Sequence, residues 1–365
     1  GKPLPRLAGC GRPYAFPGGE KETSMNIHDF ATVLKAIVRH NLLLHEEVAA
    51  VKDYLVPMAW GDPGLGKSDI AEAVAHDLGW EMVYADLATR DPADLGGMPW
   101  IENGRTIRCR PDWLPTDGSG ILFLDELPQA GIANLNIAAT LIREHRIGEH
   151  RLPPTWMVVC AGNHKHNRAG TTTMPSHVRN RLIHFEIEAD ANAWARWANA
   201  RGIDPILIAY NRYRAQDFHH HFSPTDDAYP TPRSWTATHQ VLRLDLAEPL
   251  SRACIDGMVG HSAGADFVGF RQLYANLPDL DAIITEPERG ELPSDPMTNY
   301  ALMGALSYRA SATNLDAIVR YLERLPEQEF SVVCMLDATA RNPDLTLTGA
   351  YQRWAAAHGD LLSGQ

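Results

Sequence analysis

The segment that most constrains this chain is the glycine-rich stretch from Gly61 to Ser68, with the sequence GDPGLGKS. It fits the pattern G-x-x-x-x-G-K-[ST], in which the glycines let successive backbone N–H groups turn toward phosphate oxygens. Lys67 supplies a cation for the β and γ phosphates, and the Ser68 hydroxyl is placed to reach Mg²⁺. The stretch therefore predicts a binding site for a nucleoside triphosphate.

The residues around this loop predict a strand before it and a helix after it. Residues 54–60 form a short apolar run that suits a buried strand. Ile70, Val74 and Leu78 recur at helical spacing, and Gly79 follows them as a stop signal. Strand, loop and helix thus occur in the order that a phosphate-binding loop requires.

A second motif, residues 120–126, joins a run of large apolar residues to two carboxylates, Asp125 and Glu126. Such a run is typical of a central parallel strand, whose acidic residues emerge at the carboxyl end, where ligands bind in α/β sheets. We expect Asp125 to hold the Mg²⁺ shell through water. We expect Glu126 to polarise the water that attacks the γ-phosphate, as a general base.

Five strand candidates with intervening helical patterns predict an α/β fold, a five-stranded, mostly parallel αβα sandwich of the P-loop NTPase type. The candidate strands are residues 54–60, 81–86, 120–125, 155–161 and 182–188. Apolar periodicity predicts two helices before the first strand, one starting at Asn26 and one over residues 43–54. Residues 95–115, broken by glycines and prolines, are expected to project from the sheet, with residues 106–109 pairing as a short ribbon.

Composition shifts divide the chain into four parts. Residues 1–24 hold four prolines and five glycines and are expected to be a flexible leader, a cloning remnant or a translated upstream region. Residues 25–189 form the predicted nucleotide-binding domain, residues 190–280 a helical lid domain, and residues 281–365 a helical C-terminal extension. Leu315, Ile318, Val319 and Leu322 form a helical stripe in that extension and are expected in its core.

Net charge and hydropathy limit the cellular location and the kinds of binding partner that we expect. The 33 basic and 45 acidic residues give a net charge of −12, which disfavours a broad nucleic-acid surface and favours protein partners. No stretch approaches the roughly 18 apolar residues of a membrane span. A cytoplasmic location without a membrane partner is therefore the default expectation.

Cysteines and histidines offer no clear metal cluster. The five cysteines are scattered and form no C-x-x-C pair, so we expect reduced thiols. Asp217, His219, His220 and His221 have the chemistry of metal ligands, but consecutive histidines do not easily converge on one ion. We expect a polar loop there, with Mg²⁺ as the only metal.

Four further residues are candidates for the same site. Asn163 follows the fourth candidate strand, beside the one that carries Asp125, and an amide there can orient the attacking water. Arg179 and Arg181 precede the fifth strand. Arg233 opens a helix in the second domain, from which it could reach the phosphates across an interdomain cleft.

The order of these motifs resembles the AAA+ ATPases, specifically the MoxR-like and dynein-related branch, over residues 50–270. In that resemblance residues 61–68 are Walker A, Asp125 and Glu126 are Walker B, Asn163 is sensor one, and residues 232–235 are sensor two. The insertion at residues 95–115 is then a pore-facing hairpin, and residues 146–149 belong to the element before sensor one.

The resemblance also implies an assembly and a role. Arg181, or alternatively Arg179, is an arginine finger that completes the site of a neighbouring subunit in a hexameric ring. ATP and Mg²⁺ are the cofactors, and hydrolysis of ATP to ADP and phosphate remodels or matures a client or adaptor protein, as a chaperone. One candidate client is a protein with a von Willebrand factor A-like domain.

The candidate site residues fall into three groups. The catalytic group is Glu126, Asn163, Arg181 and Arg233. The nucleotide-binding group is Gly61, Asp62, Pro63, Gly64, Leu65, Gly66, Lys67, Ser68, Asp69 and Asp125, and the metal ligands are Ser68 and Asp125.

Other functions compatible with a phosphate-binding loop stay open at this point. A P-loop kinase or small-molecule transferase would need an acceptor pocket, and a nucleic-acid-directed AAA+ motor or restriction-type GTPase relative would respond to DNA or prefer GTP. A nucleotide-gated scaffold is disfavoured because Lys67, Asp125 and Glu126 are all present.

Overall fold

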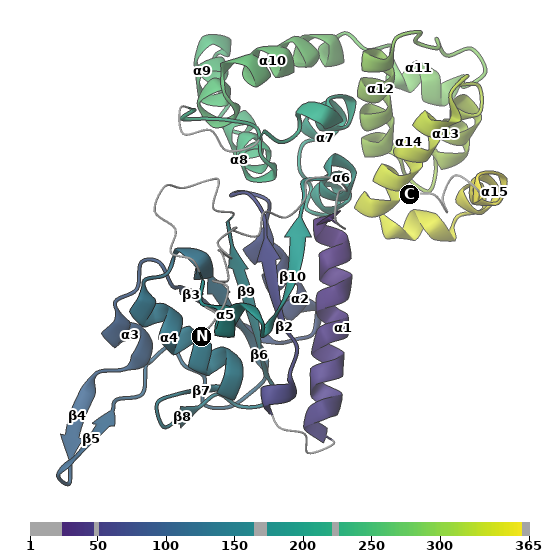
Figure 1. The fold of residues 1–365 in the computed structure, drawn as a ribbon. Helices are drawn as coiled ribbons and strands as arrows, with labels where there is room; N and C mark the ends of the chain where they lie inside the picture. The colour runs from purple at the N-terminus through teal and green to yellow at the C-terminus, as the bar shows by residue number, and fades with distance from the viewer. Residues whose placement is uncertain (1–23, 47–50, 164–173, 221–225, 360–365) are drawn as a thin grey trace, which may run out of the picture.

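The computed structural model describes residues 24–46, 51–163, 174–220 and 226–359, which form a sheet-containing part and a helical part (Figure 1). The expected leader lies outside the described residues, apart from Ser24. A parallel sheet flanked by helices is followed, among the described residues, by helices without a further strand. The predicted fold class is thus confirmed.

The main sheet is parallel throughout and has six strands, one more than the five predicted. They are β1 (Ser24–Met25), β2 (Val56–Trp60), β3 (Glu81–Asp86), β6 (Gly120–Asp125), β9 (Trp156–Gly162) and β10 (Leu182–Ile187). Their order is β1-β10-β2-β9-β6-β3. The extra strand β1 pairs with the end of β10 and is only two residues long, too short to leave an apolar pattern in the sequence.

Helices cover both faces of this sheet. On one face lie α1 (Ile27–Glu46) and α2 (Lys67–Asp77), which pack on buried side chains such as Ile121 and Phe123 of β6. On the other face α3 (Pro92–Gly96), α4 (Ile132–Glu144) and α5 (Ser176–Arg179) pack on Leu122 and Leu124. The predicted helix over residues 43–54 is wrong: α1 continues to Glu46, and residues 51–53 form only the short 3-10 helix η1 (Val51–Asp53).

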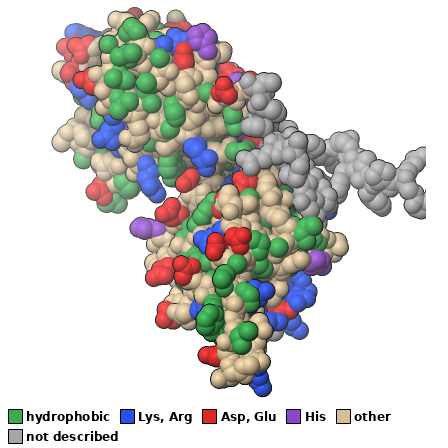
Figure 2. Space-filling view, turned by 90° about the vertical axis from the view of Figure 1, so that its left-hand side faces the viewer, with side chains coloured by type: hydrophobic (Ala, Val, Ile, Leu, Met, Phe, Trp, Pro, Cys, Tyr) green, Lys and Arg blue, Asp and Glu red, His purple; other side chains and the backbone are tan. Residues whose placement is uncertain are grey.

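The predicted insertion is a two-stranded hairpin that projects from the sheet-containing part (Figures 1 and 2). It consists of β4 (Pro99–Glu102) and β5 (Arg105–Arg108), joined by Asn103 and Gly104, which both have positive φ, at 50° and 73°. An Asn-Gly pair favours this tight hairpin turn because both residues tolerate the left-handed region. Two large apolar side chains lie in the open, since Trp100 is 64% and Ile101 is 74% exposed.

A second hairpin packs against the base of the first. It consists of β7 (Arg146–Ile147) and β8 (His150–Arg151). The Glu149 carboxylate accepts a hydrogen bond from the backbone N–H of Arg108 at 2.9 Å, and a ring nitrogen of His150 lies 2.7 Å from the Arg108 carbonyl. The two hairpins are therefore tied together at this point.

The helical part contains two apolar cores. The first belongs to α6 (Ala191–Ala200), α7 (Pro205–Tyr213), α8 (Pro232–Leu242), α9 (Glu248–Val259) and α10 (His261–Ala275). The second belongs to α11 (Leu280–Thr285), α12 (Pro296–Arg309), α13 (Leu315–Leu322), α14 (Gln328–Arg341) and α15 (Gly349–Ala357). The stripe predicted for the core of the extension lies on α13 and is buried.

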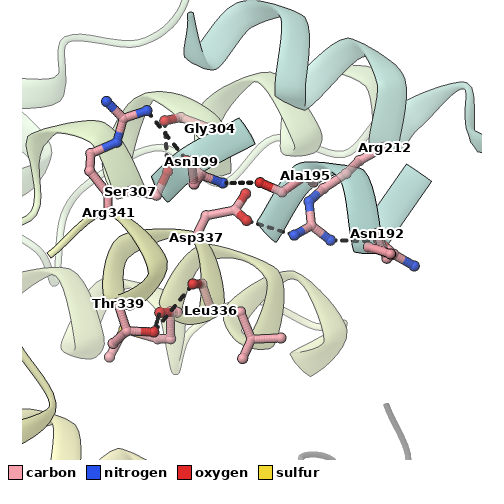
Figure 3. Close-up of polar contacts among 12 residues, drawn as sticks. Asn192, Ala195, Asn199, Arg212, Gly304, Ser307, Leu336, Asp337, Thr339 and Arg341 are labelled. Atoms are coloured by element: carbon pink, nitrogen blue, oxygen red, sulfur yellow. Dashed lines mark hydrogen bonds and ion pairs between the residues drawn. The ribbon is translucent and has the colours of Figure 1, made fainter. Parts of the chain in front are cut away.

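These two cores are joined side by side. Helix α12 packs on α7 so closely that a Cβ atom at Gly304 would lie 2.9 Å from the Cβ of Ala209. Helix α14 packs on α6 and carries Asp337, which pairs with Arg212 of α7 (Figure 3). The helices after residue 280 are thus anchored on the helices before it.

Candidate nucleotide-binding site

The glycine-rich loop connects β2 to α2 and presents the amino end of that helix. Gly66 caps α2 with φ of 88°, in the left-handed region that glycine adopts without strain, and no side chain caps the first N–H groups. Helix N-termini with open N–H groups bind phosphate, because the helix dipole favours an anion there. The loop geometry therefore suits the role predicted for residues 61–68.

Lys67 is buried at the start of α2 and points back into the loop. Its ammonium donates hydrogen bonds to the carbonyls of Gly61 and Asp62, each at 2.9 Å, and to Oδ1 of Asn163 at 3.1 Å. Burial lowers the pKa of Lys67 to about 8, while nearby carboxylates, led by Asp125, oppose that shift. The ammonium thus lies at the loop and donates to three neutral oxygens, which phosphate oxygens can replace.

Asn163 lies between the lysine and the predicted general base. It is buried at the end of β9, and its Nδ2 donates to both carboxylate oxygens of Glu126, at 3.0 and 3.3 Å. Glu126 adopts φ of 52°, in the left-handed region that residues other than glycine rarely occupy and that clusters at functional sites. The sheet thus brings Lys67, Asn163 and Glu126 into one connected group.

Asp125 ends β6 and has both carboxylate oxygens fixed. Oδ2 accepts a hydrogen bond from the Tyr84 hydroxyl at 2.9 Å, and Oδ1 accepts one from the backbone N–H of Glu126 at 2.9 Å. Asp125 also acts on the Lys67 ammonium, as the largest of the nearby charges that oppose the lowering of its pKa. The carboxylate therefore lies at the edge of the phosphate loop in a defined orientation.

The donors at this edge fit a magnesium ion that arrives with a nucleotide. Among the described residues no group of three or more His, Cys, Asp or Glu could hold a metal ion by itself. Magnesium in nucleotide sites takes one or two carboxylates and completes its shell with phosphates and water. Asp125 and the half-buried hydroxyl residue Ser68 supply the donor types that this mode of binding requires.

The helical part reaches the glycine loop through the start of α8. Thr231 and Ser234 cap this helix reciprocally, and the backbone N–H of Arg233 donates to the Gly64 carbonyl at 3.1 Å. Gly64 has φ of 84°, and a Cβ there would lie 3.0 Å from the Thr231 hydroxyl. Arg233 is close enough for its charge to help lower the pKa of Lys67. Arg233 thus lies beside the glycine loop, at the start of α8 in the helical part.

A cavity of about 450 Å³ adjoins the phosphate loop between the two parts of the molecule. Trp194 and Trp197 of α6 give it aromatic walls, and Asp190 and Gln240 add polar groups. Its other lining residues are Ile27, Gly64, Leu65, Gly66, Asp69, Ile70, Glu188, Ala189, Pro232, Arg233, Thr236 and Ala237. A cavity of this size, partly apolar and open to the loop, suits a nucleobase and ribose.

Arg179 and Arg181 lie away from this site. Leu182, the first residue of β10, pairs with Val56 at the start of β2, whereas the glycine loop follows the end of β2. At about 3.3 Å per residue along a strand, the two edges are about 15 Å apart. Both arginines are exposed. The structure therefore does not bring Arg181 together with the other predicted catalytic residues of its own chain.

Two residues at the site were missed by the sequence analysis. Tyr84 of β3 bonds to Asp125, and His219 lies 3.5 Å from the Asp62 carboxylate of the glycine loop. His219 belongs to the segment expected to be a simple polar loop, of which His221 lies outside the described residues. Tyr84 sits in no motif, and the histidine cluster that contains His219 carries no local signal that places it beside the glycine loop.

Comparisons with known proteins give likenesses of structure only. No protein-family model matches the chain, and no curated protein matches its sequence. The RuvB Holliday junction branch migration motor of Thermotoga maritima aligns with 76% of this chain and 81% of its own, at 15% identity and a TM-score of 0.39. NtrX of Brucella abortus aligns with 93% of this chain and 68% of its own, at 13% identity and a TM-score of 0.40. Its complex with ADP aligns with 92% and 68%, at 14% identity and a TM-score of 0.38.

Among the described residues, no helix is both long enough and apolar enough to cross a bilayer.

Proposed function

We propose that this protein hydrolyses ATP to ADP and phosphate at the glycine loop. The observation that carries the proposal is the connected group of Lys67, Asn163 and Glu126 beside Asp125, at the carboxyl edge of a parallel sheet. Ligands bind at this edge in α/β sheets. The four side chains supply a phosphate cation, an amide, a base and a magnesium ligand.

Each side chain has a definite part in the reaction. Lys67 exchanges the Gly61 and Asp62 carbonyls for phosphate oxygens, which stabilises the charge on the β and γ phosphates. Glu126 accepts a proton from the water that attacks the γ-phosphorus, as the bond from that phosphorus to the ADP oxygen breaks. Asn163 orients that water once its amide leaves the Glu126 carboxylate. A bound Mg²⁺ would neutralise developing charge on the phosphate oxygens, with Ser68 and Asp125 as its protein ligands.

The finer proposal is that the chain is an AAA+ ATPase of the MoxR-like kind and works as a hexameric ring in the cytoplasm. Arg181 lies far from the glycine loop of its own chain, which supports it as a finger for a neighbouring subunit. Contact of α8 with the glycine loop supports motion of the helical part with the nucleotide state. The ring would use that motion to remodel a client protein, for which a von Willebrand factor A-like protein is one candidate.

Glu126→Gln tests the hydrolysis. The amide cannot accept the proton of the attacking water, so phosphate release should fall at least about 100-fold while ATP binding persists. Binding is measured by calorimetry and release by a phosphate assay without any acceptor. Glu81→Gln is the matched control, because Glu81 is an exposed glutamate at the amino end of β3. The proposed site lies at the carboxyl ends of the strands. Normal ATP turnover by the Glu126→Gln protein would show that Glu126 is not the general base.

The same assay separates the rival functions. Phosphate release in water alone excludes a kinase or transferase that requires an acceptor. Preference for GTP over ATP, or strong stimulation by DNA, would instead favour a restriction-type GTPase relative or a nucleic-acid-directed motor. A pull-down with the Glu126→Gln protein, which retains nucleotide, would identify the client.

A further inference from the structure

Tyr84 lies one strand away from the magnesium ligand and reaches it diagonally. It pairs with Phe123 across β3 and β6, and their rings stack with centroids 6.0 Å apart. Asp125 follows two residues after Phe123, on the same face of the sheet, since side chains alternate along a strand. Aromatic side chains can span this diagonal spacing, and here the Tyr84 hydroxyl ends 2.9 Å from Oδ2 of Asp125.

With this hydrogen bond, both oxygens of the Asp125 carboxylate have a donor. The backbone N–H of Glu126 fixes Oδ1, so loss of the Tyr84 bond would leave the group held from one side only. A hydrogen bond from outside the metal shell typically orients a metal-ligating carboxylate in this way.

Packing alone does not account for the hydroxyl at this position. Tyr84 is 47% exposed on the edge strand β3, and a phenyl ring would stack on Phe123 equally well. We propose that Tyr84 is a positioning residue for magnesium-dependent nucleotide binding: its hydroxyl fixes the Asp125 carboxylate in the orientation that the metal shell requires. The proposal rests on the proposed function, because it takes Asp125 as a ligand of the metal shell.

The test compares wild-type protein with Tyr84→Phe. ADP affinity is measured by calorimetry, first with a chelator and then across a Mg²⁺ titration. We expect the metal-free ADP affinity and the melting temperature of the nucleotide-free protein to stay unchanged. The Mg²⁺ concentration that gives half of the affinity gain should rise about tenfold, the loss typical of an outer-shell hydrogen bond.

Tyr308→Phe is the matched control, because Tyr308 is a similarly exposed tyrosine (54%) that lies on α12. It should leave the Mg²⁺ titration unchanged. An unchanged titration in Tyr84→Phe overturns the role of Tyr84, and so does a loss of metal-free affinity together with a lower melting temperature. If Mg²⁺ does not change ADP binding by the wild-type protein, the metal role proposed for Asp125 fails as well. This outcome differs from failure of the Tyr84 role alone, in which only the wild-type protein and Tyr84→Phe give the same Mg²⁺ dependence.

Discussion

At the scale of single residues, the charge of Lys67 decides how strongly the loop attracts phosphate. Burial places its pKa near 8, so the empty site holds a full ammonium only below that pH. A bound phosphate favours the charged form, so ATP affinity should be constant up to about pH 8 and then fall about tenfold per pH unit. Calorimetric titration with ATP between pH 7 and 9.5 measures this, in a range where the terminal phosphate is already ionised.

Lys67→Arg is the control for that pH profile, because a guanidinium keeps its charge throughout the range. Its affinity should differ from the wild-type value at pH 7 yet stay flat up to pH 9.5. A flat profile in the wild-type protein would contradict the lowered pKa of Lys67 or its role as the cation that binds phosphate.

At the scale of helices and strands, the buried pair of Arg212 on α7 and Asp337 on α14 joins the two cores of the helical part (Figure 3). Arg212 lies 2.6 Å from Asp337 and donates a second bond to Asn192 of α6, also at 2.6 Å. Both charged side chains are almost fully buried, at 4% and 3% exposure. Removing one charge leaves the other without compensation in a dry interior, which is far costlier than losing both.

Asp337→Asn should therefore lower the free energy of unfolding by about 3 kcal/mol, measured by urea denaturation. The paired substitution Arg212→Met with Asp337→Leu, which removes both charges, should recover most of that loss. Arg320→Met is a control at an exposed ion pair and should cost less than about 1 kcal/mol. A wild-type denaturation midpoint in the Asp337→Asn protein would contradict this account of how α14 is anchored.

The elements that the sequence predicted well are those whose signals are local. The apolar runs that became β6 and β9 and the glycines before α2 each mark their structure within a few residues, and the glycines and prolines of residues 95–115 mark the projecting insertion. The missed features depend on distant partners. Tyr84 and Asp125 are 41 residues apart, and Arg212 and Asp337 are 125 residues apart. Nothing in the residues near either partner encodes such a pairing.

At the scale of the whole molecule, the proposed finger role of the arginines before β10 predicts that one chain alone is not active. The chain's own glycine loop lies at the other edge of the sheet, so Arg181 cannot contact a phosphate bound there without a large rearrangement. A neighbouring copy packed head to tail would place this edge against the next glycine loop, and such contacts close into a ring when the rotation permits.

Mixing two inactive proteins tests this arrangement. Arg181→Ala lacks the finger and Glu126→Gln lacks the base, and each alone should hydrolyse ATP at least about 100-fold more slowly than wild type. In an equal mixture, a Glu126→Gln subunit can lend its Arg181 to a neighbour that retains Glu126, which should restore activity at about a quarter of the interfaces. Arg179→Ala in place of Arg181→Ala identifies which arginine acts. Full activity of a strictly monomeric protein, or no recovery in either mixture, would contradict a finger supplied by a second subunit.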